Sequence, residues 1–510
     1  MTRPLLRLVA GRATAVLATA VLATAAAGCS SGSGGSSGGS SVKSLSVGFV
    51  AEPSNLDFTT TDGVAIPQAM LVNVYEGLVK LDQDGKIVPL LAKSWDISDD
   101  RKTYTFHLQD NATFTNGKKF TADDVVFSLN RVKTDWKVSL KSAMDVVSSV
   151  EKKDDTTAVV TLAKPSNSWL YKMATRVGAM FSRDGIADLA NTPVGTGPYK
   201  LESWKRGDAI TLAASPNYWG TKPKLEKVVL KYFKDATAMN NALLTGGIDV
   251  ISTVQAPESL QQFTNNSKYE VIEGTTTGEV VLSFNNSKAP LNDKRVRQAI
   301  RHAINHKTLV ETAWAGRGQV IGGMVPPSDP WYEDLTGVTP YDPAKAKALL
   351  AEAGQSNLKL RLRIANLPYA VAAGQVVKSQ LAEVGITADI EPLEFPARWL
   401  DVVFKQADYD MSIINHVEPR DLGALFGNPN YYLRYNNPKV QELLAKADAG
   451  PESDQIAAMK EAARLVSEDA AADFLFLFPN LIVAETGVTG LPKNLVSESF
   501  DLTVLAKAKG

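Results

Sequence analysis

Cysteine is nearly absent from this 510-residue chain, which has one, at position 29. A lone cysteine excludes a disulfide framework within the chain, so the folded part must be held by buried apolar surface. Histidine is also scarce, with four residues. Outside a Ser/Gly-rich segment near the N-terminus, neither a Gly-x-Ser-x-Gly elbow nor a His-Glu-x-x-His motif occurs. The sequence therefore predicts that the chain is not an enzyme, with no catalytic residues and no cofactor.

Neither sign of charge dominates, since 54 Lys and Arg face 55 Asp and Glu. Without a basic excess we expect no nucleic-acid partner. Apolar runs are short: Ala13–Ala27 falls below the roughly 20 residues of a membrane-crossing helix, and Phe474–Phe478 is typical of a buried strand. The length and a hydrophobic fraction of 44% predict a globular chain of two or three domains.

The N-terminus has the parts of a secretory signal. Arg3, Arg7 and Arg12 precede the apolar run, and no acidic residue occurs before Cys29. Ala26-Ala27-Gly28-Cys29 resembles a bacterial lipobox, although Ala26 stands where Leu is usual. We therefore expect residues 1–28 to be removed and Cys29 to carry a diacylglycerol; the alternative is a buried free thiol. The mature chain would have 51 basic and 55 acidic residues, a net charge of −4.

Residues 30–41 are only Ser and Gly, a composition that gives a flexible coil of roughly 20 Å end to end. With Cys29 they form a predicted linker, 29–41, between the lipid and the folded body. The expected location is thus outside the cytoplasm, anchored to the outer face of the cell membrane.

The body alternates strand and helix signals, which predicts an α/β fold with mixed sheets. Asp84-Gly85 predicts a hairpin turn, and Thr121 with Asp124 has the spacing of a capping box. Further signals predict a strand at 103–108, a helix capped by Asn292, a helix from Asp342-Pro343 to Gly354, and a strand–helix–strand unit over 358–394.

Four stretches in order resemble the large bacterial extracellular solute-binding proteins of family 5, which serve peptide and nickel importers of the ABC type. They are residues 92–131, which include Ala92-Lys93-Ser94-Trp95-Asp96; Thr196-Gly197-Pro198-Tyr199 with Asn217-Tyr218-Trp219; Gly247-Ile248-Asp249-Val250; and Phe284-Asn285-Asn286 through Ile300. Gly195–Pro198 lacks the pattern of a dinucleotide site and predicts a tight turn.

The resemblance implies a bilobal, periplasmic-binding-protein-like fold of the large three-domain type, with ligand captured between the lobes by hinge closure. The expected segments are lobe I at 42–78, 196–280 and 481–510, a smaller inserted domain at 79–195, and lobe II at 281–480.

The same resemblance implies a lipid-anchored receptor for an ABC importer that captures a di- or oligopeptide. The expected partners are the ligand, an ABC permease with its ATPase subunits, and the membrane through the lipid; we expect a monomer. The alternatives are a nickel chelate or another non-peptide solute, and a solute sensor. An exported hydrolase would need the catalytic motifs that we do not find.

In peptide-binding relatives, strand segments of both lobes pair with the ligand backbone and an aspartate holds its α-ammonium group. On this chain the first segment includes Thr276, Thr277, Gly278 and Glu279, and the second Asn415, His416, Val417, Glu418, Arg420 and Asp421. The expected ammonium-binding Asp has no unambiguous counterpart, and His416 lies in the region of a usual Trp. Glu418 or Asp421 could replace the Asp, and Arg420 could bind a ligand carboxylate. A solvated loop with a local ion pair is an equal alternative.

Trp399 is a candidate wall of the cleft, with core packing as the alternative. His302 and His306 have the i, i+4 spacing of a metal site, but Ala303 follows the first histidine, where a zinc protease has glutamate. We expect both histidines on the surface. His416 as the ligand of a metal chelate is a minor alternative, and we predict no metal site.

Overall fold

The computed structural model describes residues 43–508. The predicted signal (1–28), Cys29 and the linker to Ser41 lie outside the described residues. Among residues 43–508, no helix has both the length and the apolar character needed to span a membrane.

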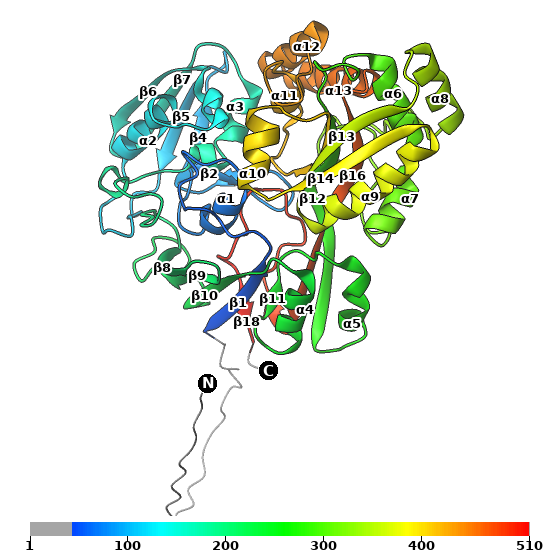
Figure 1. Cartoon of the computed structure of the whole chain (residues 1–510). Coiled ribbons are helices and arrows are strands. Elements are labelled where there is room, and N and C mark those ends of the chain that lie inside the picture. Colours follow the sequence, from blue (N-terminus) through cyan, green and yellow to red (C-terminus); the bar gives the residue numbers. More distant parts are fainter. Residues whose placement is uncertain (1–42, 509–510) are drawn as a thin grey trace, which may run out of the picture. The chain divides into compact units, whose positions relative to one another are not determined.

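A ten-stranded mixed sheet forms the centre of the folded body (Figure 1). Pairing is parallel for β1 with β10 and β11 and for β13 with β14, and antiparallel for β12 with β15 and β16. The predicted mixed α/β architecture is thus confirmed. In sheet order the strands are β14 (Ile386–Leu393), β13 (Leu358–Ala365), β15 (Met411–His416), β12 (Tyr269–Phe284), β16 (Ala472–Glu485), β11 (Val250–Ile251), β1 (Ser44–Phe49), β10 (Lys227–Tyr232), β9 (Ala209–Ala214) and β8 (Tyr199–Lys205).

The two longest strands, β12 and β16, join the two halves of this sheet. They pair from Tyr269 opposite Glu485 to Ser283 opposite Ala472, with the ladder interrupted between Thr275 and Glu279. We propose that the lobes meet in these strands, at the predicted boundaries near residues 280 and 480. Lobe I below means residues 43–280 with 481–508, and lobe II means residues 281–480.

The predicted inserted domain, residues 79–195, contains a separate antiparallel sheet of four strands packed on helix α2. Thr121 precedes this helix, and its backbone N–H donates to Asp124 Oδ2 at 2.9 Å, so the predicted capping box is confirmed. The elements are β4 (Ala92–Ile97), β5 (Thr103–Leu108), β7 (Thr157–Leu162), β6 (Val147–Asp154), α2 (Ala122–Thr134), α3 (Asn167–Lys172) and the 3-10 turns η1 (Ser139–Met144), η2 (Arg176–Gly178) and η3 (Arg183–Gly185).

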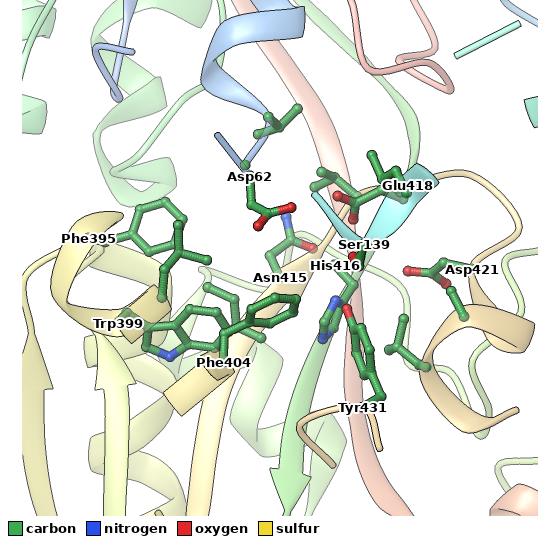
Figure 2. A pocket seen from close by; sticks show the side chains of 18 of the residues that line it. Asp62, Ser139, Phe395, Trp399, Phe404, Asn415, His416, Glu418, Asp421 and Tyr431 are labelled. Atoms are coloured by element: carbon green, nitrogen blue, oxygen red, sulfur yellow. The ribbon is translucent and has the colours of Figure 1, made fainter. Parts of the chain in front are cut away.

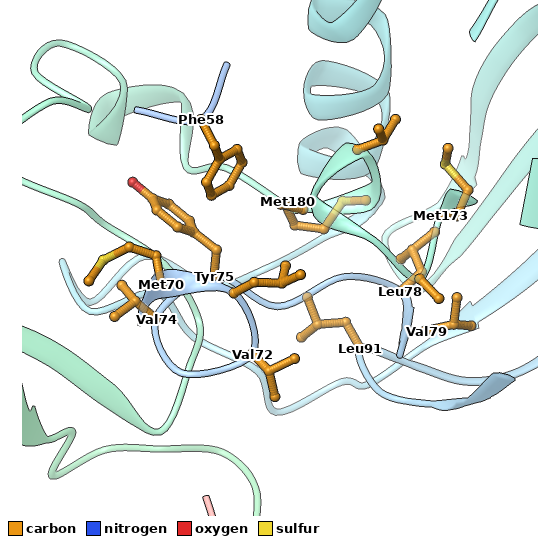
Figure 3. Close-up of a cluster of buried hydrophobic side chains, with 14 of the residues drawn as sticks. Phe58, Met70, Val72, Val74, Tyr75, Leu78, Val79, Leu91, Met173 and Met180 are labelled. Carbon is orange, nitrogen blue, oxygen red and sulfur yellow. The ribbon is translucent and has the colours of Figure 1, made fainter. Parts of the chain in front are cut away.

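A continuous apolar core connects this domain to the rest of lobe I. Figure 3 shows part of it, where Phe58 and Tyr75 lie near Met180. The predicted hairpin is confirmed as β2 (Val79–Leu81) and β3 (Ile87–Pro89). The turn at Gly195 crosses residue 74 so closely that a Cβ would lie 1.9 Å from the Val74 carbonyl oxygen, so only glycine fits.

Lobe II surrounds its part of the sheet with helices. The predicted strand–helix–strand unit is confirmed as parallel β13 and β14 joined by α9. The predicted N-cap at Asn292 is wrong by one residue, because the Asp293 side chain accepts from the Arg295 N–H at 2.8 Å. The helices are α6 (Lys294–Ala303), α7 (His306–Ala313), α8 (Pro343–Glu352), α9 (Pro368–Glu383), α10 (Ala397–Trp399), the π-helical turn η5 (Leu400–Lys405), α11 (Leu422–Phe426), α12 (Pro438–Ala449) and α13 (Glu452–Glu468).

The predicted helix start at Asp342-Pro343 in lobe II is also confirmed, since Asp342 accepts from the Lys345 N–H at 2.9 Å.

Short elements complete lobe I. The remaining elements are α1 (Ala65–Met70), α4 (Ala236–Leu244), η4 (Pro257–Leu260), α5 (Gln261–Thr264), β17 (Val488–Thr489) and β18 (Ala506–Lys507).

Candidate functional site

A cavity of about 150 Å³ lies where the two lobes face each other, and we call it the chamber. Its lining is more apolar than polar, with carboxylates entering from both lobes (Figure 2). Lobe I contributes Asp62, Gly63, Val64, Ser139, Leu140 and Arg176, and lobe II contributes Phe395, Trp399, Leu400, Phe404, Ile414, Asn415, His416, Val417, Glu418, Asp421, Ala424, Leu425 and Tyr431.

Two neighbouring cavities share walls with the chamber. One, of about 170 Å³, shares Asn415 and Val417 with it and is also lined by Thr276, Thr277 and Gly278. The other, of about 460 Å³, shares Glu418 and Asp421. The three cavities therefore form one interlobe cleft with the 415–421 loop along its length.

The 276–278 segment lies in the cleft because it leaves the β12–β16 ladder. The Thr276 hydroxyl donates to the Phe478 carbonyl at 2.5 Å and accepts from the Gly278 N–H at 2.9 Å. The Thr277 hydroxyl donates to the Val417 carbonyl at 3.0 Å, which ties this segment to the end of β15. Glu279 returns to the β12–β16 ladder opposite Leu477 and pairs on its other side with His416 of β15.

Arg176 joins the lobes at the edge of the chamber. It is buried, and its guanidinium reaches Glu498 at 2.7 Å, the Gly63 carbonyl at 2.6 Å and Glu418 of lobe II at 3.2 Å. Burial alone would oppose the charge, but Glu498 and Glu418 raise the pKa of Arg176 above its usual value. The carboxylate of Glu418 is thus already paired with a cation from the opposite lobe.

Asp421 and Glu279 have no such partner. Asp421 is 5% exposed and Glu279 2% exposed, and one carboxylate oxygen of each has no hydrogen bond within the described chain. Burial, followed by Glu418 and Asp329, raises the pKa of Asp421 well above its usual value, and burial with Asp421 does the same to the pKa of Glu279. A positive group bound beside these two carboxylates would favour their charged forms and lower both pKa values.

His416 lines the chamber but is largely buried, and its Nε2 lies 2.8 Å from the Tyr432 hydroxyl. Burial lowers the pKa of His416 to about 3, so its imidazole is neutral. Ligand atoms of His416, Glu418 and Asp421 lie within 4.8 Å of one another, which is compatible with a metal ion. Arg176 beside Glu418 opposes a second positive charge there.

Arg420 does not line the chamber, but it lines the neighbouring cavity of about 460 Å³. Its guanidinium lies 4.0 Å from the ring centre of Tyr171, in the inserted domain, and 4.9 Å from that of Trp331. Asp329 lies 3.5 Å from its Nε, and burial raises the pKa of Asp329 to about 6 despite this arginine. Arg420 thus joins the two lobes as a cation between aromatic rings.

Trp399 is both a wall and a core residue. It is 3% exposed, its indole N–H donates to the Ser412 hydroxyl at 3.1 Å, and its ring packs on Phe395 and Phe404. These three rings line one side of the chamber, and Figure 2 shows them on the side away from Asp421.

Comparison with known proteins assigns this arrangement to a family. The sequence profile of the bacterial extracellular solute-binding proteins, family 5 Middle, matches residues 86–432. The chain belongs to this family. The resemblance drawn from four sequence stretches is confirmed, family members are binding proteins rather than enzymes, and the location is extracytoplasmic.

Individual relatives cover most of the chain. Heme-binding protein A of Haemophilus influenzae is 29% identical over 446 residues, which are 78% of this chain and 80% of that protein. The dipeptide-binding protein of Escherichia coli is 30% identical over 372 residues, or 66% of this chain and 68% of that protein. The solved structure of the periplasmic binding protein DppA of Helicobacter pylori, in complex with the peptide STSA, has a TM-score of 0.82 at 25% identity and covers 91% of this chain and 98% of that one.

The expectation of surface positions for His302 and His306 is wrong. His302 is 3% exposed and its Nδ1 lies 2.6 Å from the Pro340 carbonyl, while His306 Nε2 lies 2.9 Å from the buried Asp473. His302 lies on α6 and His306 begins α7, with extended backbone at Ile304 and Asn305 between them, so the i, i+4 spacing does not place them on one helix face.

Several lining residues were not predicted from the sequence. Asp62, Arg176, Phe395, Phe404 and Tyr431 line the chamber, yet none lies in a local pattern that marks a binding residue. The presence of Phe395 and Phe404 on either side of Trp399 was the one available signal, since aromatic residues at this spacing can share a face.

Proposed function

We propose that this chain is the solute receptor of an ABC importer and that it captures a peptide between its two lobes. The observation that carries the proposal is a cleft lined from both lobes, with a strand segment of each along its wall. The dipeptide-binding relative and the STSA complex supply the substrate class by similarity.

Recognition of a peptide backbone follows from the strand geometry. Residues 276–278 have left the β12–β16 ladder, and Asn415 and Val417 at the end of β15 line the same cavity. β12 is a central strand, so these groups lie at a gap within the sheet, where Thr276 also bridges Leu495. Backbone groups that have left a ladder can pair with an extended peptide, largely independent of its sequence. We therefore retain Thr276, Thr277, Gly278, Asn415 and Val417 as proposed contacts.

Of the two carboxylates considered for a positive ligand group, Asp421 fits better. Glu418 is held by Arg176, whereas one Asp421 oxygen has no partner within the described chain. We propose that Asp421 pairs with a positive group on the ligand and that Glu418 stabilises the closed arrangement through Arg176. In this arrangement Arg420 joins the lobes instead of binding a ligand carboxylate.

Delivery requires partners at the membrane. We propose that Cys29 carries the lipid anchor and that the closed form docks on a permease with its ATPase subunits. Replacing Cys29 with Ser should release the protein from the membrane fraction without changing its affinity for peptide in solution. Retention of Cys29→Ser at the membrane would contradict the anchor, and a loss of affinity would contradict the separation of anchor and site.

The direct test is a thermal-shift screen of the purified protein against a peptide library. Ligand at about a hundredfold its Kd should stabilise the folded state by roughly 2.7 kcal/mol. The same screen with Ni²⁺ and Ni²⁺–histidine tests the metal alternative at His416, Glu418 and Asp421. Stabilisation by nickel species without any by peptides would replace peptide by a metal complex as the solute.

A further inference from the structure

The chamber combines an aromatic wall with carboxylate groups. Its lobe II wall is aromatic, with Phe395, Trp399, Phe404 and Tyr431 (Figure 2). Aromatic faces attract organic cations, and the attraction is stronger where water is excluded. The carboxylates of Asp62 and Asp421 also line the chamber; Figure 2 shows Asp421 on the side of Tyr431, away from Phe395 and Trp399, and Asp62 near Asn415.

Neither of these two carboxylates makes a direct ion pair within the described residues. Asp62 makes no side-chain hydrogen bond or ion pair with any residue of 43–508, and one oxygen of the 5%-exposed Asp421 is also without a partner. The nearby cations are already engaged: Arg176 holds Glu418 and Glu498, and Arg420 faces Asp329. Arg176 and, more weakly, Lys405 act on Asp62 through space; Lys405 is exposed and is not part of the lining.

A buried carboxylate without a partner is costly, and a bound cation removes that cost. A bare metal ion would gain nothing from the aromatic wall, and Arg176 lies 3.2 Å from one of its would-be ligands. An alkylammonium or alkylguanidinium group has the required combination, since its stem is apolar and its end is charged.

The position of the chamber indicates which part of a peptide would carry that charge. The released backbone of 276–278 lines the adjoining cavity, and that cavity meets the chamber at Asn415 and Val417. A peptide backbone paired there would direct a side chain into the chamber.

We propose that the chamber is a specificity pocket for a basic side chain, whose stem packs on Phe395, Trp399 and Phe404 and whose charged end pairs with Asp421, with Asp62 as the second carboxylate of the lining. This inference rests on the proposed function and adds the class of side chain that the site selects.

The test compares two peptides that differ only in charge. Calorimetry on the full chain would use N-acetylated, C-amidated Ala-Lys-Ala and its norleucine analogue, with the unblocked pair measured alongside. We expect the lysine peptide to bind roughly tenfold or more tightly, because a charge-assisted hydrogen bond and a cation–π contact are both lost with norleucine. Asp421→Asn and, separately, Asp62→Asn should reduce this preference to about threefold or less.

Asp401→Asn is the matched control, because Asp401 is exposed on η5 beside the aromatic wall but does not line the chamber. It should leave the preference unchanged. Melting temperatures report whether each variant folds, and Asp62, which is only partly buried, provides a second test if Asp421→Asn is unstable.

Each outcome supports or refutes the basic-side-chain pocket. Equal affinity for the two side chains, or a preference that survives both variants, overturns the basic-side-chain pocket while leaving a peptide receptor in place. Equal affinity of the two unblocked peptides, both tighter than their blocked forms and both weakened by Asp421→Asn or Asp62→Asn, assigns the carboxylates to the N-terminal ammonium and overturns the inference. If neither peptide binds but other peptides in the library do, the pocket is again refuted; if no peptide binds at all, the proposed function fails first.

Discussion

The contact between α3 and α12 allows the closed state to be weakened without touching the ligand cavity. We call this contact the latch: Arg101, Ser166, Asn167 and Ser168 of lobe I with Ala447–Gly450 of lobe II. Figure 1 shows the two helices adjacent to each other. Asp448 accepts from the Ser168 backbone N–H at 2.9 Å and from the Ser166 hydroxyl at 2.8 Å.

Asp448 therefore caps a helix of the opposite lobe. Ser166, at the N-cap position of α3, makes no capping bond of its own, and Arg101 donates to the Ala449 and Gly450 carbonyls at the end of α12 at 2.6 and 2.7 Å. Loss of a cap costs about 1 kcal/mol, and a hydrogen bond to a charged group contributes about 1.5–3 kcal/mol. Because water can satisfy the donors once the lobes separate, we expect Asp448→Ala to destabilise only the closed state, by about 1–2 kcal/mol.

The expected result is a weaker affinity with unchanged chemistry at the site. If the open form dominates without ligand, the whole cost appears in Kd, a rise of about 5- to 30-fold. Calorimetry with a peptide from the library screen measures it, and Glu442→Ala, an exposed substitution on α12 away from α3, is the control. An unchanged Kd in Asp448→Ala, with the control also unchanged, would refute the reasoning that the latch sets closure.

Three further predictions concern stability, all measured by urea unfolding. Burial raises the pKa of Glu76 to about 7 despite hydrogen bonds from Thr196, Tyr218 and Trp219. The contribution of Glu76 to the free energy of unfolding is therefore complete below pH 4.5 and is lost as the pH rises through 7, by up to about 3 kcal/mol. Glu76→Gln should flatten this pH dependence, and equal slopes for the two proteins would contradict it. Arg176→Met should cost about 3–5 kcal/mol because it leaves Glu498 buried without a partner, so a loss below 1 kcal/mol would be inconsistent. Gly195→Ala should lose about 2 kcal/mol or more through its clash with the Val74 carbonyl, and wild-type stability would show that the turn can move.

The features that could be predicted from sequence are those whose causes lie within a few residues. The capping box of Thr121 and Asp124 and the Asp84-Gly85 hairpin were found because two positions carry the whole signal in each case. The error at Asn292 is of the same kind, since Asp293 has an equally good capping side chain and the register of α6 decides between them.

The chamber could be predicted only in part, because it is assembled from distant segments. Arg176 and Glu498 are 322 positions apart, and no local pattern relates them. Family resemblance located the 276–279 and 415–421 segments, but it did not indicate which carboxylate was already paired. That distinction, between Glu418 and Asp421, depends on an arginine from the other lobe.

The central claim is that the lobes close over the solute, and a distance between them tests it most directly. Because Cys29 is the only cysteine, Cys29→Ser with Lys153→Cys and Lys347→Cys gives one exposed label on the inserted domain and one on lobe II. Pulsed electron spin resonance should show a shorter and narrower distance distribution at saturating peptide than without it, and a longer one without peptide in Asp448→Ala. Identical distributions with and without peptide, at a concentration where calorimetry proves binding, would contradict capture by closure.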